Sequence, residues 1–417
     1  MKYAIVTFGC RVNQADSFQL EEQLICSGGT ASSAQDADLI VVNTCSVTSS
    51  ADQGARQVVR KIARENPAAR IVVTGCYATR RPDEVRALAG VVQIVPNSRK
   101  DSLAQEIGLT TAQRFGGGDG ACGAPIAPGL AGRTAFTLRV QTGCDQACSY
   151  CIIPSTRGPG RSRPLADVLS ELDRVRQAGY REVAITGVHL GSYGRDRSDG
   201  STLLRLMRAL DRHVPDMLLR ISSLEPMDCS DEIVDLVAAS TCIAPHFHLP
   251  LQHASDAMLL AMRRPYTLAY YRRLVDRIRD RIPHASIGTD IIVGFPGESD
   301  EDFALLDAYL RDAPITHLHV FPYSDRPGTA AAELTGTVHG SIVRERAGLV
   351  RAIGRALNQR FHSAQSGSVR PGLTIEDGSL VMTDNYLKVR IPPGLPRNER
   401  VKVAIAGRGD ALVGTLV

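Results

Sequence analysis

The sequence predicts an α/β protein in three parts: an N-terminal open parallel α/β sheet, a central partial (β/α)6 barrel and a small C-terminal β-barrel. Apolar strands alternate with helices over roughly the first 110 residues, and a longer alternation begins near residue 134. The last fifty or so residues hold only short strand-like runs between turns. We place the parts at 1–115, 134–362 and 363–417, with a linker at 116–133. A chain of 417 residues has room for two to three domains.

The N-terminal part follows a strand–helix rhythm. Its strands are predicted at Tyr3–Phe8, Asp38–Asn43 and Arg70–Thr74, and its helices at Gln14–Ser27 and Ala51–Glu65. This rhythm is typical of a small open parallel sheet.

The linker is predicted from its glycine, alanine and proline content. Beyond it, amphipathic helices such as Pro164–Gln177 and Asp300–Asp312 separate six predicted strands. These strands are Thr137–Gln141, Glu182–Thr186, Leu218–Ser222, His246–Leu251, Ser286–Val293 and His317–Phe321. Six units indicate a partial barrel rather than a closed eightfold one. The tail is predicted to form a β-barrel from the runs Leu373–Glu376, Leu387–Ile391, Arg400–Ile405 and Ala411–Leu416.

Composition narrows the class of protein. Hydrophobic residues make up 43% of the chain and charged residues 22%, which is typical of a globular protein. No apolar run approaches the roughly 18 residues of a membrane span, and the N-terminus reads as a strand rather than a signal peptide. Ten cysteines without an export signal favour metal binding over disulfides, and therefore a reducing cytoplasm.

Three cysteines lie within eight residues, with the spacing C-x3-C-x2-C: Cys144, Cys148 and Cys151. A [4Fe–4S] cluster usually takes four thiolates, so this loop would leave one iron open to another ligand. A structural zinc site needs four ligands at paired spacings, and the closest downstream candidate is His189. We therefore expect an iron–sulfur cluster here, with a zinc knuckle or inert thiols as the alternative.

A second trio of cysteines follows the three N-terminal strands: Cys10, Cys45 and Cys76. The carboxyl ends of parallel strands lie along one sheet edge, so the three thiols should converge. Any one of them alone would more often be a packing residue. Together they predict a second three-thiolate cluster, whose open iron could carry an exogenous sulfur atom.

Motifs along nearly the whole chain resemble those of the methylthiotransferases, a family of radical S-adenosylmethionine enzymes. The matching segments are Gly9–Gln14, Val42–Thr48, Val73–Ala78, Gln141–Pro154, Arg157–Gly158, Arg161–Arg163, Thr186–His189, Arg220–Pro226, Leu249–Gln252, Met262–Thr267 and Asp290–Glu298. The tail segment Thr383–Tyr386 resembles the TRAM module, which binds RNA.

The resemblance implies a cofactor set and a reaction. It implies two [4Fe–4S] clusters and S-adenosylmethionine, which the open iron of the Cys144 loop would chelate and cleave to a 5′-deoxyadenosyl radical. The GCxVN, NTCxVT and TDNY forms resemble the bacterial branch that acts on N6-threonylcarbamoyladenosine, immediately 3′ of the tRNA anticodon. The implied reaction replaces the adenine C2 hydrogen with a methylthio group. A radical is needed because an aromatic C–H bond is too inert for polar substitution.

Other activities stay open. The target could be an isopentenylated adenosine in tRNA or a ribosomal-protein aspartate, since both need the same chemistry. From another class, the chain could be a non-catalytic iron–sulfur RNA-binding or electron-transfer protein. A carrier gains nothing from an open iron, which argues against that reading.

The resemblance also nominates contact residues, each of which could instead be a turn, a cap or a surface ion pair. The residues expected to contact S-adenosylmethionine are Thr186, Gly187, Ser222, Ser223, Glu225, Gln252, Gly294, Phe295 and Pro296. Those expected to contact RNA are Arg157, Arg263, Arg272, Arg273, Tyr386 and Lys388. The expected partners are the anticodon stem-loop of tRNA and a flavodoxin or ferredoxin reductant, with the protein a monomer.

Two further patterns carry no assigned role. His246-x-His248 and His317-x-His319 each place two imidazoles on one strand face, but the sequence shows no carboxylate in register, so packing or hydrogen bonding is preferred over metal binding. The cysteines that match no motif are Cys26, Cys122, Cys229 and Cys242. Of these, Cys122 is expected to be an exposed thiol in the linker.

Overall fold

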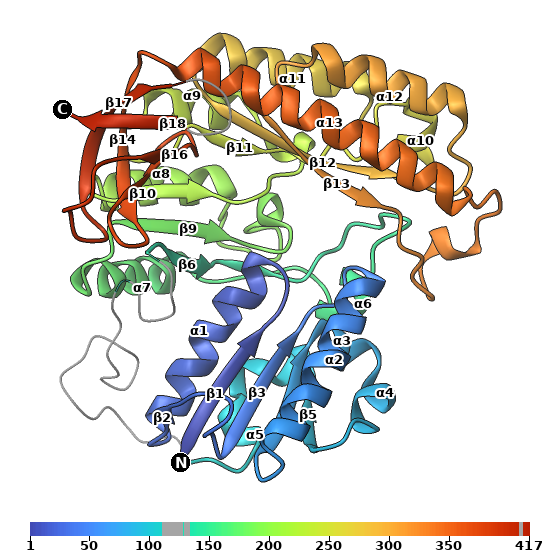
Figure 1. Cartoon of the computed structure of the whole chain (residues 1–417), viewed down its shortest axis with the longest axis vertical. Helices are drawn as coiled ribbons and strands as arrows, with labels where there is room; N and C mark the ends of the chain where they lie inside the picture. The colour runs from blue at the N-terminus through green and yellow to red at the C-terminus, as the bar shows by residue number, and fades with distance from the viewer. Residues whose placement is uncertain (111–127, 129–133, 408–411) are drawn as a thin grey trace.

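The computed structural model describes residues 1–110, 128, 134–407 and 412–417 (Figure 1). All of the predicted linker except residue 128, and with it Cys122, lies outside the described residues. The predicted fold class is confirmed: an N-terminal parallel sheet, a central partial barrel and a closed C-terminal β-barrel follow one another along the chain.

The N-terminal sheet has five parallel strands in the order β2-β1-β3-β4-β5. The strands are β1 (Lys2–Thr7), β2 (Thr30–Ala31), β3 (Leu39–Thr44), β4 (Arg70–Gly75) and β5 (Val91–Val95). The helices are α1 (Arg11–Cys26), α2 (Ser49–Glu65), α3 (Cys76–Arg80), α4 (Pro82–Arg86) and α5 (Leu103–Glu106), with a 3-10 turn η1 (Asn97–Ser102). Sequence reasoning missed β2 and β5, the two edge strands, because they bury too little apolar surface to stand out.

The central part has six parallel strands in two hydrogen-bonded groups, β10-β9-β6 and β11-β12-β13, joined by a bridge between Leu219 and Ile243. The strands are β6 (Phe136–Arg139), β9 (Glu182–Thr186), β10 (Leu218–Ile221), β11 (His246–His248), β12 (Ser286–Val293) and β13 (His317–Pro322). The flanking helices are α7 (Leu165–Gln177), α8 (Leu203–His213), α9 (Asp231–Ala239), α10 (Asp256–Ala261), α11 (Leu268–Arg281), α12 (Asp300–Asp312) and α13 (Gly340–Gln365). The short elements are β7 (Gln141–Thr142), α6 (Ile153–Arg157), β8 (Arg161–Ser162), η2 (Leu190–Ser192), η3 (Pro226–Asp228) and η4 (Ala330–Glu333).

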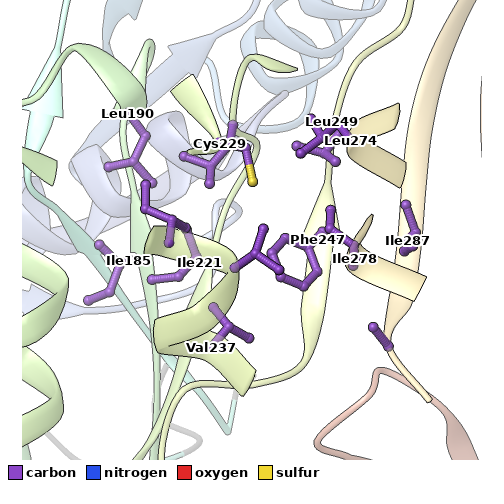
Figure 2. Packing of buried hydrophobic residues seen from close by; sticks show 14 of the residues in the cluster. Ile185, Leu190, Ile221, Cys229, Val237, Phe247, Leu249, Leu274, Ile278 and Ile287 are labelled. Atoms are coloured by element: carbon purple, nitrogen blue, oxygen red, sulfur yellow. The ribbon is translucent and has the colours of Figure 1, made fainter. Parts of the chain in front are cut away.

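The central core lies between the strands and the helices outside them. Figure 2 shows Ile185, Ile221, Phe247 and Ile287, from four different strands, packed with side chains from α9 and α11. Because successive strand residues point to opposite faces, the residues between these apolar ones face the barrel interior. The polar residues on this face are Glu182, Thr186, Arg220, Ser222, His246, His248, Asp290, His317 and His319. A polar interior enclosed by apolar walls is where the chemistry of such a fold is expected.

The C-terminal barrel is closed, with strand order β14-β15-β16-β18-β17. Its strands are β14 (Val369–Ile375), β15 (Leu380–Thr383), β16 (Lys388–Arg390), β17 (Arg400–Ala406) and β18 (Leu412–Leu416), and α13 leads into it past the expected boundary at residue 362. Sequence reasoning missed β15, although Val381 at its centre is fully buried in the barrel core. Within the described residues, no helix is both long enough and apolar enough to cross a bilayer.

Candidate active site

The first cysteine trio assembles at the carboxyl edge of the N-terminal sheet, as its placement after three strands predicted. Cys10 and Cys45 follow β1 and β3, and Cys76 begins α3 directly after β4. Glycine is required before two of them. At Gly9 (φ +94) an added Cβ would come within 2.7 Å of the Cys45 sulfur, and at Gly75 (φ +97) within 2.2 Å of a backbone oxygen. Both positions need the left-handed backbone that glycine adopts without cost.

The surroundings of this trio fit an iron–sulfur cluster. Burial, together with the neighbouring thiols Cys10 and Cys76, raises the pKa of Cys45 to about 11. Ligation of a metal would require this thiol to lose its proton. The hydroxyls of Ser46 and Thr74 are buried and, among the described residues, have no hydrogen-bond partner. Hydroxyl donors without an acceptor suit a cluster, whose bridging sulfides accept hydrogen bonds.

The second trio lies in the loop between β7 and α6. Gly143 (φ +75) lets this loop pass the backbone of Pro159, where a Cβ would approach an oxygen to 1.8 Å. Ser149 fixes the middle of the loop, because its amide donates to the Met262 carbonyl (3.2 Å) and its carbonyl accepts from the Ala331 amide (2.7 Å). Burial raises the pKa of Cys151 to about 12, and ligation of a metal would likewise require loss of its proton.

Neither trio has the geometry of a zinc site. Tetrahedral zinc with Zn–S bonds of about 2.3 Å holds its sulfurs about 3.8 Å apart. In the described part of the chain, the one trio of histidine, cysteine or carboxylate ligand atoms within 4.8 Å of each other is His248, Asp290 and His319. The cysteine trios are spread more widely, as expected when each thiolate binds a different iron of one cube.

Arg264 is a site residue that sequence reasoning missed. Its guanidinium lies 3.2 Å from the Cys148 sulfur and forms an ion pair with Glu225. Its neighbour Arg263, which the sequence nominated for RNA, is exposed instead. Both arginines belong to the motif segment Met262–Thr267, so the motif indicated the place but not which side chain points inward.

His189, the histidine considered as a possible zinc ligand, does reach the cysteine loop. It hydrogen-bonds Asp228 through Nε2 (2.7 Å). Although burial opposes protonation, hydrogen bonds to Asp228 and Cys144 raise the pKa of His189 to about 9. Among the described residues, His189 does not complete a set of metal-ligand atoms within 4.8 Å of one another with these cysteines.

The two trios meet through α6, which follows Cys151 closely and packs on α3, the helix that begins at Cys76. Asn97 bridges the two sides, because its side-chain amide donates to the Cys76 sulfur (3.6 Å) and to the Thr156 carbonyl (2.9 Å). The last residue of α6, Arg157, then reaches into the N-terminal domain. The site therefore lies at a junction between domains.

Buried charges stabilise this junction. Asp16 accepts from Arg157 (3.0 Å) and Lys100 (2.9 Å), and also pairs with Arg139. Burial opposes ionisation of Asp16, yet the three cations hold its pKa below the ordinary value. Arg157, nominated for RNA, is thus buried within the junction, where Asn13 also accepts from it (2.5 Å).

The first group of residues nominated for S-adenosylmethionine lies on the barrel interior. Thr186 ends β9, and Gly187 packs against Gln141, where an added Cβ would lie 3.0 Å from two of its atoms. After β10, the Ser222 hydroxyl is buried without a hydrogen-bond partner among the described residues, which fits a bound polar ligand. Ser223 instead bonds His248 (2.5 Å).

The second nominated group lies in the segments after β11 and β12 and is largely buried. Gln252 (φ +72) is buried and bridges to β12 through its backbone. The amides of Gly294 and Phe295 both donate to the Glu298 carboxylate, at 2.6 and 3.3 Å. Phe295 and Pro296 are buried, and Phe295 packs with Met258 and Met262. Glu298 thus fixes the conformation of this turn through its amides, and the expected backbone contact with adenine stays a prediction.

The histidine pairs differ from expectation. The sequence analysis found no carboxylate in register, but Asp290 on the intervening strand β12 accepts from both His248 (3.0 Å) and His319 (3.2 Å). The carboxylate was missed because it lies on the neighbouring strand β12, 42 residues after His248 and 29 residues before His319. Spacing within β11 or β13 cannot show a residue on another strand. His248 and His319 are therefore hydrogen-bonded as preferred, but the premise that no carboxylate lies in register was wrong, and the three side chains have ligand atoms within 4.8 Å of one another.

The remaining residues nominated for RNA do not share one surface environment. Arg272 and Arg273 are exposed on α11, where the Arg272 guanidinium lies 4.8 Å from the Tyr309 ring centre. Lys388 is exposed on β16. Tyr386 is also exposed (38%), although its ring stacks on His246, the first residue of β11, with ring centres 4.5 Å apart.

The described cysteines that match no motif lie in packed parts of the structure. Cys229 lies in the central core (Figure 2), and burial raises its pKa to about 12. Cys242 is buried beside Asp211, which accepts from its sulfur at 3.1 Å. Cys26 is disulfide-bonded, contrary to the expectation that the cysteines serve metal binding rather than disulfides.

Comparison with known proteins agrees with this geometry. Residues 2–96 match the uncharacterized protein family UPF0004, and residues 138–310 match the Radical SAM superfamily. The threonylcarbamoyladenosine tRNA methylthiotransferase MtaB of Aquifex aeolicus is 36% identical, over 94% of this chain and 96% of that protein. The MtaB of Bacillus subtilis is 34% identical, over 93% and 89%. The tRNA-2-methylthio-N(6)-dimethylallyladenosine synthase of Parafrankia sp. is 33% identical, over 88% and 76%.

Among solved structures, the radical S-adenosylmethionine methyltransferase TsrM of Kitasatospora setae, with cobalamin and a [4Fe–4S] cluster bound, superposes with a TM-score of 0.56. The match covers 79% of this chain and 76% of that one at 15% identity, so it supports the fold alone. The assignment to a family rests instead on the relatives that match nearly the whole chain. With its two cysteine trios joined at a domain junction, the chain belongs to the radical S-adenosylmethionine methylthiotransferase family.

Proposed function

We propose that this enzyme transfers a methylthio group to C2 of N6-threonylcarbamoyladenosine, next to the anticodon of tRNA. The observation that supports the proposal is the pair of cysteine trios joined through α6, which would bring a radical source and a sulfur source to one junction. Relatives named for this nucleoside match nearly the whole chain. Relatives named for dimethylallyladenosine match almost as well, which makes that base the second candidate.

The trios are proposed to hold two [4Fe–4S] clusters. Cys144, Cys148 and Cys151 would hold the one that binds S-adenosylmethionine, and the trio that includes Cys10 would hold the other. When bound, these groups supply an electron, a carbon-centred radical and the transferred sulfur.

The protein's own residues position the bound groups and neutralise their charge. Arg264 places a positive charge beside Cys148, and Ser222 offers a buried hydroxyl to the cofactor. Asp16 and Arg157 hold the two domains together, which would keep the two cysteine trios in one relative orientation. We also propose that the enzyme acts as a cytoplasmic monomer that receives single electrons from a flavodoxin or ferredoxin.

The test is nucleoside analysis of tRNA from a strain that lacks the gene. We expect the methylthio-threonylcarbamoyl nucleoside to disappear and to return when the chain is restored. The Cys10/Cys45/Cys76 triple alanine variant should retain about four of about eight irons and still form 5′-deoxyadenosine, without restoring the nucleoside. Loss of the dimethylallyl nucleoside instead would favour the second candidate. Absence of any S-adenosylmethionine cleavage would favour a non-catalytic carrier.

A further inference from the structure

We propose that Arg11 and the Tyr386 hydroxyl form a binding site for a carboxylate on the N6 substituent of the target adenosine. This site would select an anionic threonylcarbamoyl group over an apolar dimethylallyl group. The inference rests on the proposed function and names the residues that decide its substrate.

The chemical difference between the two candidate bases lies entirely in the N6 substituent. A threonylcarbamoyl group ends in a free carboxylate and carries a hydroxyl, whereas a dimethylallyl group is a hydrocarbon. Discrimination therefore requires a cation, or donors without acceptors, where the substituent lies. Because C2 and N6 belong to one purine, such a group must lie close to the sulfur-carrying trio.

Arg11 meets this requirement by position and by charge. It follows Cys10 directly, at the start of α1, and is only half-buried. Its Nη2 donates to the Tyr386 hydroxyl (3.0 Å), and among the described residues it has no carboxylate partner. The buried Arg157 and Arg220, by contrast, are paired with Asp16 and Glu182.

An arginine presents five donors in a planar fork, so one bond to a hydroxyl leaves others available to a carboxylate. A partly buried guanidinium without a counter-ion is also costly, and an incoming anion relieves that cost. Arg11 is thus suited to a bidentate carboxylate contact.

Tyr386 is held rigidly for this contact. Its backbone has φ +70, a conformation that non-glycine residues adopt only when neighbouring structure enforces it. The enforcing contacts come from the barrel. The ring stacks on His246, and Arg220 lies 5.0 Å from the ring centre. Arg220 also donates to the carbonyls of Thr383 (3.2 Å) and Asp384 (2.9 Å), which fixes the turn.

The surrounding charges leave no carboxylate to compete for Arg11 among the described residues near Tyr386. Asp384, two residues before Tyr386, is paired with Arg370. Glu182 is bound by Arg220, and Asp290 accepts from His248 and His319. The site is also composite, since Arg11 comes from the N-terminal domain and Tyr386 from the C-terminal barrel. Substrate choice and assembly of the three domains are therefore linked.

The test compares three anticodon stem-loop RNAs that carry the threonylcarbamoyl group, its methyl ester or a dimethylallyl group. Binding is followed by fluorescence anisotropy at one salt concentration, and kcat/KM is measured with the reconstituted enzyme. We expect Arg11→Gln to weaken binding and kcat/KM about 10- to 100-fold for the carboxylate RNA alone. The ester should behave alike with parent and variant. Tyr386→Phe should give a smaller loss, and Arg11→Lys should retain part of the preference.

Two controls separate recognition from damage to the neighbouring cluster. Iron content and 5′-deoxyadenosine formation without RNA should match the parent in every variant. Arg86→Gln, an exposed arginine of the same domain paired with Asp83, should leave all three RNAs unaffected. Equal losses of Arg11→Gln on all three RNAs would indicate a phosphate contact and overturn the inference, as would an unchanged preference. If the parent enzyme modifies only the dimethylallyl RNA, the proposed function fails together with the inference.

Discussion

At the residue scale, the active site depends on which of two adjacent arginines turns inward. α10 ends in a Schellman motif, in which the Arg263 amide bonds the Leu260 carbonyl and the Arg264 amide bonds the Leu259 carbonyl. Arg263 takes the left-handed position (φ +56) and projects into solvent, and Arg264 turns back against Cys148. A local backbone motif thus places the charge beside the sulfur.

This placement predicts opposite outcomes for the two arginines. Arg264→Gln should reduce reductive cleavage of S-adenosylmethionine by about 10- to 100-fold, because it removes the charge beside Cys148 and leaves Glu225 unpaired. Arg263→Gln should stay within about twofold of the parent. The measurement is 5′-deoxyadenosine formation by anaerobically reconstituted protein without RNA. Similar losses of 5′-deoxyadenosine formation in both variants would show that the charge beside the Cys148 sulfur does not determine cleavage.

At the element scale, three parallel strands that are each followed by a cysteine build the first trio, and glycine precedes two of these cysteines. β1 and β4 each pass through a glycine with positive φ before the cysteine, which lets neighbouring strand ends approach within van der Waals distance. The buried, apolar β3 lies between these two strands, so the three cysteines become neighbours.

Substitution of one of these glycines should remove one cluster selectively. In Gly75→Ala the new Cβ would lie 2.2 Å from the Thr44 oxygen, so the strand end must shift. We expect iron to fall from about eight to about four per chain, while 5′-deoxyadenosine formation continues. Gly54→Ala is the matched control. It lies in α2 with nothing within 4 Å of the added Cβ, and it should gain about 0.5–1 kcal/mol in stability with full iron content.

At the scale of the whole molecule, a buried charge cluster holds the N-terminal domain against the central barrel, and each of these two parts carries one cysteine trio. Asp16 is fully buried and pairs with cations from its own domain and from the barrel. Exposed ion pairs contribute little, but removal of one member of a buried network leaves the others uncompensated.

Asp16→Asn should therefore lower the free energy of unfolding by about 3–5 kcal/mol, since Arg157 and Lys100 remain buried without a counter-charge. Asp101→Asn is its control. Asp101 pairs with the same Arg139 at 2.8 Å, but it is 64% exposed, so its loss should cost less than about 1 kcal/mol. Anaerobic denaturant unfolding measures both. Equal effects would contradict the assignment of the junction's stability to Asp16.

Sequence reasoning succeeded where the signal is local. Strands such as β9 and β12 have the predicted bounds because a buried apolar run is readable within one short segment. Both cysteine trios were found for the same reason: one lies in a single loop, and the other repeats at the ends of successive strands. Edge strands such as β2 escaped, because two residues carry no periodic pattern.

What the sequence determined by itself was therefore the fold class and the two sets of thiols, since both follow from patterns along the chain. Only the tertiary structure decided which charged and polar side chains contact one another. Asp290 joins His248 and His319 because three strands lie side by side, and Arg11 meets Tyr386 across 375 residues. Such contacts depend on how separate elements pack, and no spacing in the sequence encodes them.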